Sequence, residues 1–445
     1  MTRTIGRVIR RLVFSLAAVL AAGCSDDPGG AGDDIGDTTV PVTSQDTTTT
    51  TTVTTVPSTT ITVPTFHVTG RVVDPGGSPV ARAFVTMGET RSVTGPDGWF
   101  SFQVTEPGSM EVSKPGWGSA EVAWAPETVR YEATITPVTI RGVRVSAESA
   151  QSDAAFDDLL ELAESTAVNA LVFDTKQEGG KVLHDTSVQD AHDIGAVEVF
   201  YDAAARVAQA HERGLYTITR IVTFEDAERA DAFPDEKLAG PWLDPTSATA
   251  REYNLALAEE ACELGFDEIQ FDYVRYPTGR AAEVSGQRDL TQEQRTSAIA
   301  AFLTEARERL HAKGCAVGAA VFGIVVSVPD DQGLGQRPEE VSAQVDTLSP
   351  MVYPSHYSNG WLGYDDPNDH PYDVTADAIS DATPRLASGT TLRPYLQAFW
   401  WTNDQIRASI QAAEDAGIGW LLWNIASNFD VAALPTDAEV EGSAS

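Results

Sequence analysis

From about residue 140 onward, short apolar runs alternate with longer stretches in which apolar positions recur about every 3.6 residues. The short runs predict strands: GVRVSAES, NALVFDTK, YTITRIVTF, DEIQFDYVRY, AVGAAVFGI, TLSPMVYPS, RPYLQAFW and GWLLWNI. The stretches between them predict helices, and four of these stretches end at a glycine, the residue favoured just past a helix. Eight strands with seven intervening helices predict an α/β protein with a (β/α)8 barrel over residues 140–432. A doubly wound sheet is the alternative, but no GxGxxG follows its first strand.

Residues 66–137 follow a different pattern, with seven short segments in which apolar and polar residues alternate. Turn sequences such as PGGSP and GPDGW separate these segments. The pattern predicts a small all-β sandwich of immunoglobulin-like type in front of the barrel. It offers no cluster of catalytic side chains.

The first residues look like an export signal rather than part of a fold. The basic stretch RTIGRVIRR precedes the apolar stretch LVFSLAAVLAA, and AAGC then ends at Cys24. This arrangement resembles a bacterial lipobox, which implies that residues 1–23 are removed and that Cys24 carries acyl chains. We therefore expect the protein on the outer face of the cytoplasmic membrane, attached by lipid. Residues 24–65 are rich in Thr and Pro and predict a disordered linker, and 433–445 predict a disordered tail.

The charge balance narrows the possible ligands. The chain carries 65 acidic and 30 basic residues, a formal net charge of −35. Such a surface repels nucleic acid and favours a neutral or cationic ligand. No HxH, HExxH or metal-type cysteine spacing occurs, so no metal or cofactor is expected, although ligation by carboxylates alone stays open. Cys262 and Cys315 precede successive strands and could be neighbours, but buried free thiols are the commoner case.

Polar and aromatic residues gather at the C-terminal ends of the predicted strands, where barrels of this kind carry their active sites. They are Asp174, Lys176, Arg220, Glu225, Asp226, Gln270, Asp272, Arg275, Tyr353, His356, Tyr357, Trp361, Gln397, Trp400, Trp401, Trp423 and Asn424. Two carboxylates beside an acetal carbon can divide the acid and nucleophile or base roles of glycoside hydrolysis. Tryptophan and tyrosine at the rim offer flat faces on which sugars stack.

The sequence also resembles two known families. Residues 66–137 resemble the carboxypeptidase regulatory-like domain, through VTGRVVDPGGSPVARAFVTM and TGPDGWFSFQV. About residues 140–430 resemble the glycosyl hydrolase TIM-barrel domain family, through NALVFDTKQEGG, ITRIVTFED, LGFDEIQFDYVRYP, SPMVYPSHYSNG, LRPYLQAFW and GWLLWN. This resemblance implies a glycosidase-type barrel and matching positions at Asp174, Arg220, Asp272, Arg275, Tyr353, His356 and Gln397. Glu178, Glu225 and Asp226 lie where this sequence departs from the family pattern.

The favoured hypothesis is a monomeric glycoside hydrolase that acts on an extracellular or cell-wall polysaccharide. Strand alternation places Gln270 and Asp272 toward the barrel interior and Ile269, Phe271 and Tyr273 on the opposite side. Asp272 is predicted to be the nucleophile or base, kept ionised by Arg220 or Arg275, with Asp174 as the favoured second carboxylate and Glu225 or Asp226 in reserve.

The predicted substrate-binding residues are Lys176, Arg220, Gln270, Arg275, Tyr353, His356, Gln397, Trp400, Trp423 and Asn424. Two alternatives remain: a sugar-binding barrel without turnover, and a polysaccharide deacetylase with a metal held by carboxylates.

Overall fold

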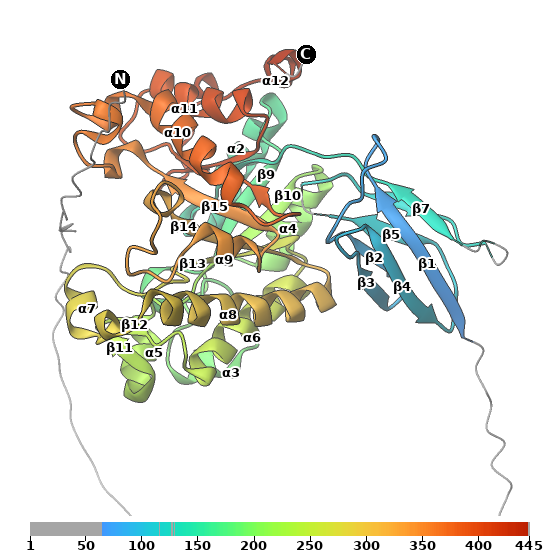
Figure 1. The fold of residues 1–445 in the computed structure, drawn as a ribbon, viewed down its shortest axis with the longest axis horizontal. Helices are drawn as coiled ribbons and strands as arrows, with labels where there is room; N and C mark the ends of the chain where they lie inside the picture. Colours follow the sequence, from blue (N-terminus) through green and yellow to red (C-terminus); the bar gives the residue numbers. More distant parts are fainter. Residues whose placement is uncertain (1–64, 115, 126–127, 129, 444–445) are drawn as a thin grey trace, which may run out of the picture. The chain divides into compact units, whose positions relative to one another are not determined.

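The larger part of the protein is a closed barrel of parallel strands surrounded by helices (Figure 1). The computed structural model describes residues 65–114, 116–125, 128 and 130–443. In this part of the chain, the barrel strands are β8 (Arg141–Arg144), β9 (Ala170–Lys176), β10 (Tyr216–Val222), β13 (Glu268–Asp272), β14 (Ala316–Phe322), β15 (Thr347–Val352), β16 (Thr391–Leu392) with β17 (Tyr395–Gln397), and β18 (Trp420–Trp423). Pairing of β14 with β15 and of β18 with β8 closes the sheet, so the predicted (β/α)8 barrel is confirmed.

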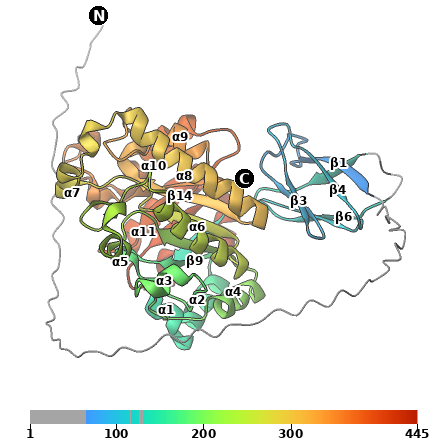
Figure 2. The same ribbon diagram turned by 90° about the horizontal axis from the view of Figure 1, so that it is seen from below.

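One helix predicted from the apolar periodicity follows each of the first seven barrel strands, and helices cover the outside of the barrel (Figure 2). They are α1 (Ala147–Gln151), α2 (Asp153–Ser165), α3 (Gln189–Asp193), α4 (Ala203–Glu212), α5 (Ala227–Ala232), α6 (Ala248–Glu263), α7 (Gly279–Val284), α8 (Gln292–Lys313), α9 (Pro338–Ser342), α10 (Pro371–Ala382), α11 (Asn403–Asp415) and α12 (Asp437–Ser443). Capping boxes at Thr291 and Thr402 begin α8 and α11. Gly314 ends α8 with a φ of 96°, a backbone conformation that residues other than glycine rarely adopt.

Two apolar layers hold the barrel together. On the helix-facing side, residues such as Phe173, Phe271 and Phe302 belong to one large buried cluster. Inside the barrel, Val172, Ile218, Ala320, Tyr353, Tyr395 and Leu421 form a second cluster. The interior is therefore filled with side chains below the mouth, which leaves the C-terminal ends of the strands as the place for a site.

The strand β9 contains an irregularity that decides where two of its side chains lie. Arg220 of β10 faces Asp174, but the next residue, Ile221, faces Lys176, so Thr175 is an extra residue in the ladder. A bulge of this kind re-aims the residue that follows it. Asp174 consequently points toward the interior with Arg220, whereas Lys176 turns to the helix-facing side.

Residues Phe66–Thr134 form two sheets that share one apolar core, and most of their strand pairs are antiparallel. One sheet contains β4 (Trp99–Val104), β1 (Phe66–Val73) and β7 (Tyr131–Thr134). The other contains β3 (Thr90–Val93), β2 (Phe84–Met87), β5 (Met110–Ser113) and β6 (Ala120–Val122). All seven segments predicted as strands from their alternation are strands in the structure, and β4 shows the expected alternation of exposed and buried residues.

Three further expectations meet different outcomes. Cys262 and Cys315 form a disulfide with a Cα–Cα distance of 5.9 Å, so the free thiols favoured from the sequence are wrong. The predicted disordered tail is wrong over residues 433–443, because Ala433 and Leu434 are buried in the barrel core and α12 follows them. The export signal, Cys24 and the linker lie outside the described residues. Within the described residues, no helix combines the length and the apolar character that a membrane span requires.

Candidate active site

The centre of the site is the guanidinium of Arg220 on β10, which contacts three carboxylates. Its Nε donates to Asp272 Oδ2 at 2.8 Å, its Nη1 donates to Asp174 Oδ1 at 3.1 Å, and its Nη2 donates to Glu178. Burial alone would lower the pKa of Arg220, but the three carboxylates raise it well above its ordinary value. Arg220 is therefore a permanent cation that fixes the position of acidic groups from β9, β13 and the loop after β9.

Two arginines bind the carboxylate of Asp174 and shield it from solvent. Besides Arg220, it accepts a hydrogen bond at 2.6 Å from Nη2 of Arg144 on β8, and its side chain is only 1% exposed. Arg144 in turn donates to the carbonyl oxygen of Ile425 and stacks on Trp423 with 4.4 Å between Cζ and the ring centre. Asp174, predicted as the second catalytic carboxylate, thus lies at the site but is occupied by two arginines, which suits it to hold Arg220 in place.

Asp272 ends β13 at the mouth of the barrel. Its Oδ2 accepts from Arg220, and its Oδ1 accepts from the backbone N–H of Tyr273 at 2.7 Å. Tyr273 has a φ of 49°, in the left-handed region that a tyrosine adopts only at a cost. This turn ends the strand and brings the Tyr273 ring to 5.9 Å from Cζ of Arg220. Tyr273 packs against the helix-facing apolar cluster, as predicted, and its ring also lies beside Arg220 because strand alternation stops at Asp272.

Two glutamates with opposite pKa shifts lie beside this cluster. Desolvation would raise the pKa of Glu178, but the charge and hydrogen bond of Arg220 outweigh it and hold that pKa below its ordinary value. Glu225 accepts one hydrogen bond, 2.8 Å from the N–H of Gly179, and shows no ion pair within the described residues. Desolvation and the neighbouring charge of Glu178 raise the pKa of Glu225. Carboxyl groups whose pKa values are pushed apart are the usual acid and base of such sites.

Lys176 and Asp226, both named as candidates from the sequence, form a buried ion pair away from the mouth. Lys176 Nζ donates to Asp226 Oδ2 at 2.7 Å and to Asn254 Oδ1 at 2.8 Å, and neither charged side chain is exposed. Asp226 also caps α5 by accepting from the N–H of Arg229. The structure therefore gives Lys176 no access to a ligand, because the bulge in β9 turns it to the helix-facing side.

Three predicted binding amides make contacts that position other groups. Gln270 is buried in the interior and donates to Ser349 at 3.1 Å. Gln397 accepts from Ser355 and so ties the loop after β15 to β17. Asn424 donates to the carbonyl oxygen of Ala398 at 2.6 Å and accepts from two backbone N–H groups of its own loop.

Aromatic side chains extend from the carboxylates to the rim. Tyr353, buried next to Asp272, has its pKa raised well above the ordinary value by burial, so its hydroxyl stays protonated. Its ring contacts His356 and Phe399 edge-on, at 5.4 Å between ring centres in both cases. Phe399 in turn contacts Trp400, which is 82% exposed and has a φ of 60°. A strained backbone that holds an aromatic ring in solvent suits a residue that contacts a ligand.

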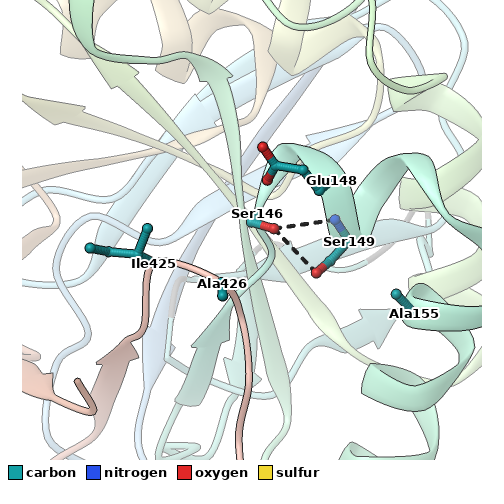
Figure 3. Close-up of a pocket in the computed structure, with 6 residues that line it drawn as sticks. All are labelled: Ser146, Glu148, Ser149, Ala155, Ile425 and Ala426. Atoms are coloured by element: carbon teal, nitrogen blue, oxygen red, sulfur yellow. Dashed lines mark hydrogen bonds between the residues drawn. The ribbon is translucent and has the colours of Figure 1, made fainter. Parts of the chain in front are cut away.

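A hollow lies next to the Arg144 contact, at the ends of β8 and β18 (Figure 3). Its lining residues are Ser146, Glu148, Ser149, Ala155, Ile425 and Ala426. Ser146 begins α1 by accepting from the N–H of Ser149. None of the carboxylates around Arg220 lines this hollow, so it lies beside the acidic cluster rather than over it.

Sequence reasoning missed several residues of the cluster. Glu178 lies where the sequence departs from the family pattern, and no sequence pattern indicates Arg144 or Tyr273 as site residues. Each depends on a feature that periodicity does not reveal: a short turn, a partner on another strand, or a left-handed residue. The signal that could have identified Arg144 is a charged residue between the apolar residues Val143 and Val145, at the C-terminal end of the first strand. Among the residues described, no three His, Cys, Asp or Glu side chains are grouped so that they could hold a metal ion.

The fold is an α/β barrel, and acidic side chains gather around Arg220 at the C-terminal ends of its strands. Residues 142–429 match the family model described as "Putative glycosyl hydrolase domain", and the chain belongs to this family. The protein is thus a hydrolase of the glycosidase class. No curated protein sequence matched the chain.

Several solved structures are similar to the chain. One is the glycoside hydrolase domain of PgaB (BpsB) from Bordetella bronchiseptica, with 13% identity, a TM-score of 0.49, and coverage of 65% of this chain and 95% of that chain. Another is a chitinase from Chromobacterium violaceum, with 13% identity, a TM-score of 0.44, and coverage of 69% and 99%. A hypothetical protein from Ruminiclostridium thermocellum has 27% identity, a TM-score of 0.34, and coverage of 40% and 96%. Membership of the family rests on the sequence match over residues 142–429.

Proposed function

We propose that the protein is an exported, lipid-anchored glycoside hydrolase that cleaves an extracellular or cell-wall polysaccharide, with Glu225 as the general acid and Asp272 as the ionised carboxylate. The observation that carries the proposal is the pair of environments around Arg220: Asp272 is paired with the guanidinium, whereas Glu225 is kept apart from it and has a raised pKa. Glycoside hydrolysis needs one carboxyl group of each kind.

Glu225 supplies the proton that the leaving sugar requires. A carboxyl group with a raised pKa is still protonated when an ordinary glutamate has lost its proton, so it can protonate the glycosidic oxygen as the bond breaks. The N–H of Gly179 fixes the Glu225 carboxyl in the loop after β10. Glu178 supports this role, because its negative charge contributes to the raised pKa of Glu225.

Asp272 faces the positive charge that develops at the anomeric carbon. It either attacks that carbon or removes a proton from the attacking water, and both roles require the ionised form. Nε of Arg220 donates to one oxygen of Asp272, and the N–H of Tyr273 fixes the second oxygen. Asp174 then acts as a positioning residue, since it contacts Arg220 and Arg144.

The exposed aromatic rim supports a polymeric carbohydrate as the substrate class. Tyr353, Phe399 and Trp400 lead from Asp272 to solvent, and sugars stack on such rings. The pattern that ends at Cys24 supports export and lipid attachment, and the disulfide between Cys262 and Cys315 suits an oxidising compartment. The resemblance of residues 66–137 to a carboxypeptidase regulatory-like domain supports an accessory, non-catalytic role for the sandwich.

The proposal is tested with a glycan panel that includes cell-wall and capsular polysaccharides, read for new reducing ends. We expect release of reducing ends from at least one polymer by the wild type and no release by Glu225→Gln. Release of acetate without new reducing ends would instead identify a deacetylase, and equal release by Glu225→Gln would remove Glu225 from the mechanism.

A further inference from the structure

Arg275 is a buried arginine with no ionic partner. Its side chain lies three residues after Asp272 and is only 5% exposed. Its Nη1 donates to the carbonyl oxygen of Tyr276 at 2.9 Å, but Nε and Nη2 donate to no other residue that the structure describes. The guanidinium lies among the rings of Trp242, Tyr273 and Phe322, at 4.4, 5.0 and 4.4 Å from their centres.

The other buried arginines show how unusual this is. Six arginines are buried in the described part of the chain, and every one except Arg275 forms an ion pair with a carboxylate. The five paired residues are Arg144, Arg206, Arg220, Arg229 and Arg393. A buried charge is costly unless it is paired, and ring contacts offset only part of that cost. The missing partner therefore points to a ligand.

The guanidinium of Arg275 remains positively charged at neutral pH. Desolvation lowers the pKa of Arg275 to about 10, while the charges of Asp272 and Glu225 oppose this shift. The guanidinium is therefore protonated under ordinary conditions, and the groups that act on it are those of the catalytic cluster. The Tyr273 ring lies 5.0 Å from Cζ of Arg275 and 5.9 Å from Cζ of Arg220, so Arg275 lies one ring away from the cation that holds Asp272.

We propose that Arg275 binds a carboxylate on the substrate, so that the polysaccharide contains uronate or another carboxylate-bearing sugar next to the cleaved bond. This inference rests on the proposed function. Nε and Nη2 present two adjacent N–H donors in one plane, which match the two oxygens of a carboxylate. A neutral sugar hydroxyl satisfies only one of these donors and leaves the charge without a partner.

The net charge of −35 favours neutral or cationic ligands at long range, and the proposal differs from that expectation. Surface charges are screened over about 8 Å at physiological salt, so a contact inside the site depends on the groups that line it. A single carboxylate held by Arg275 is thus compatible with an acidic surface. We expect binding to strengthen as salt rises from very low concentration, because salt weakens the long-range repulsion.

The test uses the full mature chain with Asp272→Asn, which blocks turnover, and pairs of oligosaccharides that differ only by reduction of the carboxylate to an alcohol. Oligouronates of several linkages supply these pairs, and calorimetry measures affinity. We expect at least one oligouronate to bind about tenfold more tightly than its reduced form. Adding Arg275→Met should remove this preference, and adding Arg275→Lys should leave part of it because the charge remains.

Arg280 provides the matched control, since it is exposed on α7, close in sequence to Arg275. Arg280→Met should leave the preference unchanged, and circular dichroism and thermal melting verify that each variant is folded. Equal affinity for every oligouronate and its reduced form, or an equal loss in Arg280→Met, overturns the inference. Failure of the proposed function looks different: the wild type then cleaves no glycan, while the Arg275-dependent preference for the carboxylate persists.

Discussion

The Nε of Arg220 lies 2.8 Å from Oδ2 of Asp272, and this contact joins β10 to β13 at the mouth of the barrel. The same guanidinium also contacts Asp174 and Glu178, so one cation positions three acidic groups. Glu225 is the neighbouring carboxyl that takes no part in this network. The proposed roles of Asp272 as nucleophile or base and of Glu225 as general acid follow from this arrangement.

Replacing Glu225 with glutamine should remove the proton donor. We expect kcat/KM to fall by about 10²–10⁴-fold on natural glycans, because this is the usual contribution of a general acid. Aryl glycosides with good leaving groups need little protonation, so their cleavage should fall much less. Steady-state kinetics on both substrate types measures the difference, and an equal loss on both would show that Glu225 does not protonate the leaving group.

The alkaline limb of the pH profile should depend on Glu178. Its charge raises the pKa of Glu225, and the protonated acid is lost as pH rises through that pKa. In Glu178→Gln the raising charge is absent, so the pKa of Glu225 falls and the alkaline limb of kcat/KM should move to lower pH. A limb that stays in place or moves to higher pH would contradict the coupling of these two glutamates.

The elements of the fold follow closely from the sequence, whereas the site does so only in part. The pattern predicts all eight barrel strands and one helix in each of the seven intervals between them, because a strand buried on both faces and an amphipathic helix each have a clear apolar pattern. The shorter helices α1, α3, α5 and α7 lie in the same intervals and are not predicted. Asp174, Arg220 and Asp272 were found for the same reason: they are charges within apolar strands. The structure brings these three side chains into contact with one another.

What periodicity could not predict depends on local irregularities and on partners from distant segments. The bulge at Thr175 moves Lys176 out of the site, and the left-handed Tyr273 moves an aromatic ring into it. The role of Asp174 changes because Arg144, on another strand, occupies one of its oxygens. The proximity of Glu178 and Glu225 depends on a turn in which the N–H of Gly179 reaches Glu225.

The buried pair of Lys176 and Asp226 should affect stability rather than substrate binding. Asp226→Asn keeps an acceptor for the α5 cap but leaves the buried Lys176 charge without its partner. We expect the free energy of unfolding to fall by about 3–5 kcal/mol, as measured by urea denaturation. Asp231→Asn is the matched control, because Asp231 pairs with Lys237 on the surface and should change stability by less than about 1 kcal/mol. Equal effects of the two variants would contradict a structural role for Asp226.

The exposed Trp400 should bind sugars distant from the cleaved bond. Trp400→Ala removes one stacking surface, so KM for a long polysaccharide should rise about 2- to 12-fold, while KM for the shortest cleaved oligosaccharide stays within about twofold. Trp99→Ala is the control, since Trp99 is a partly exposed tryptophan on β4 of the sandwich. An equal rise for long and short substrates would place Trp400 at the cleaved bond instead of the rim.

The most direct test of the account is the turnover of Asp272→Asn on a polysaccharide that the wild type cleaves. The asparagine still accepts the Tyr273 N–H, and Arg220 keeps its contacts with Asp174 and Glu178, so the variant should fold with unchanged circular dichroism. We predict that its kcat falls by about 10²–10⁴-fold or more, because an amide can neither attack the anomeric carbon nor take a proton from water. Turnover equal to that of the wild type would contradict the assignment of Asp272 as a catalytic residue.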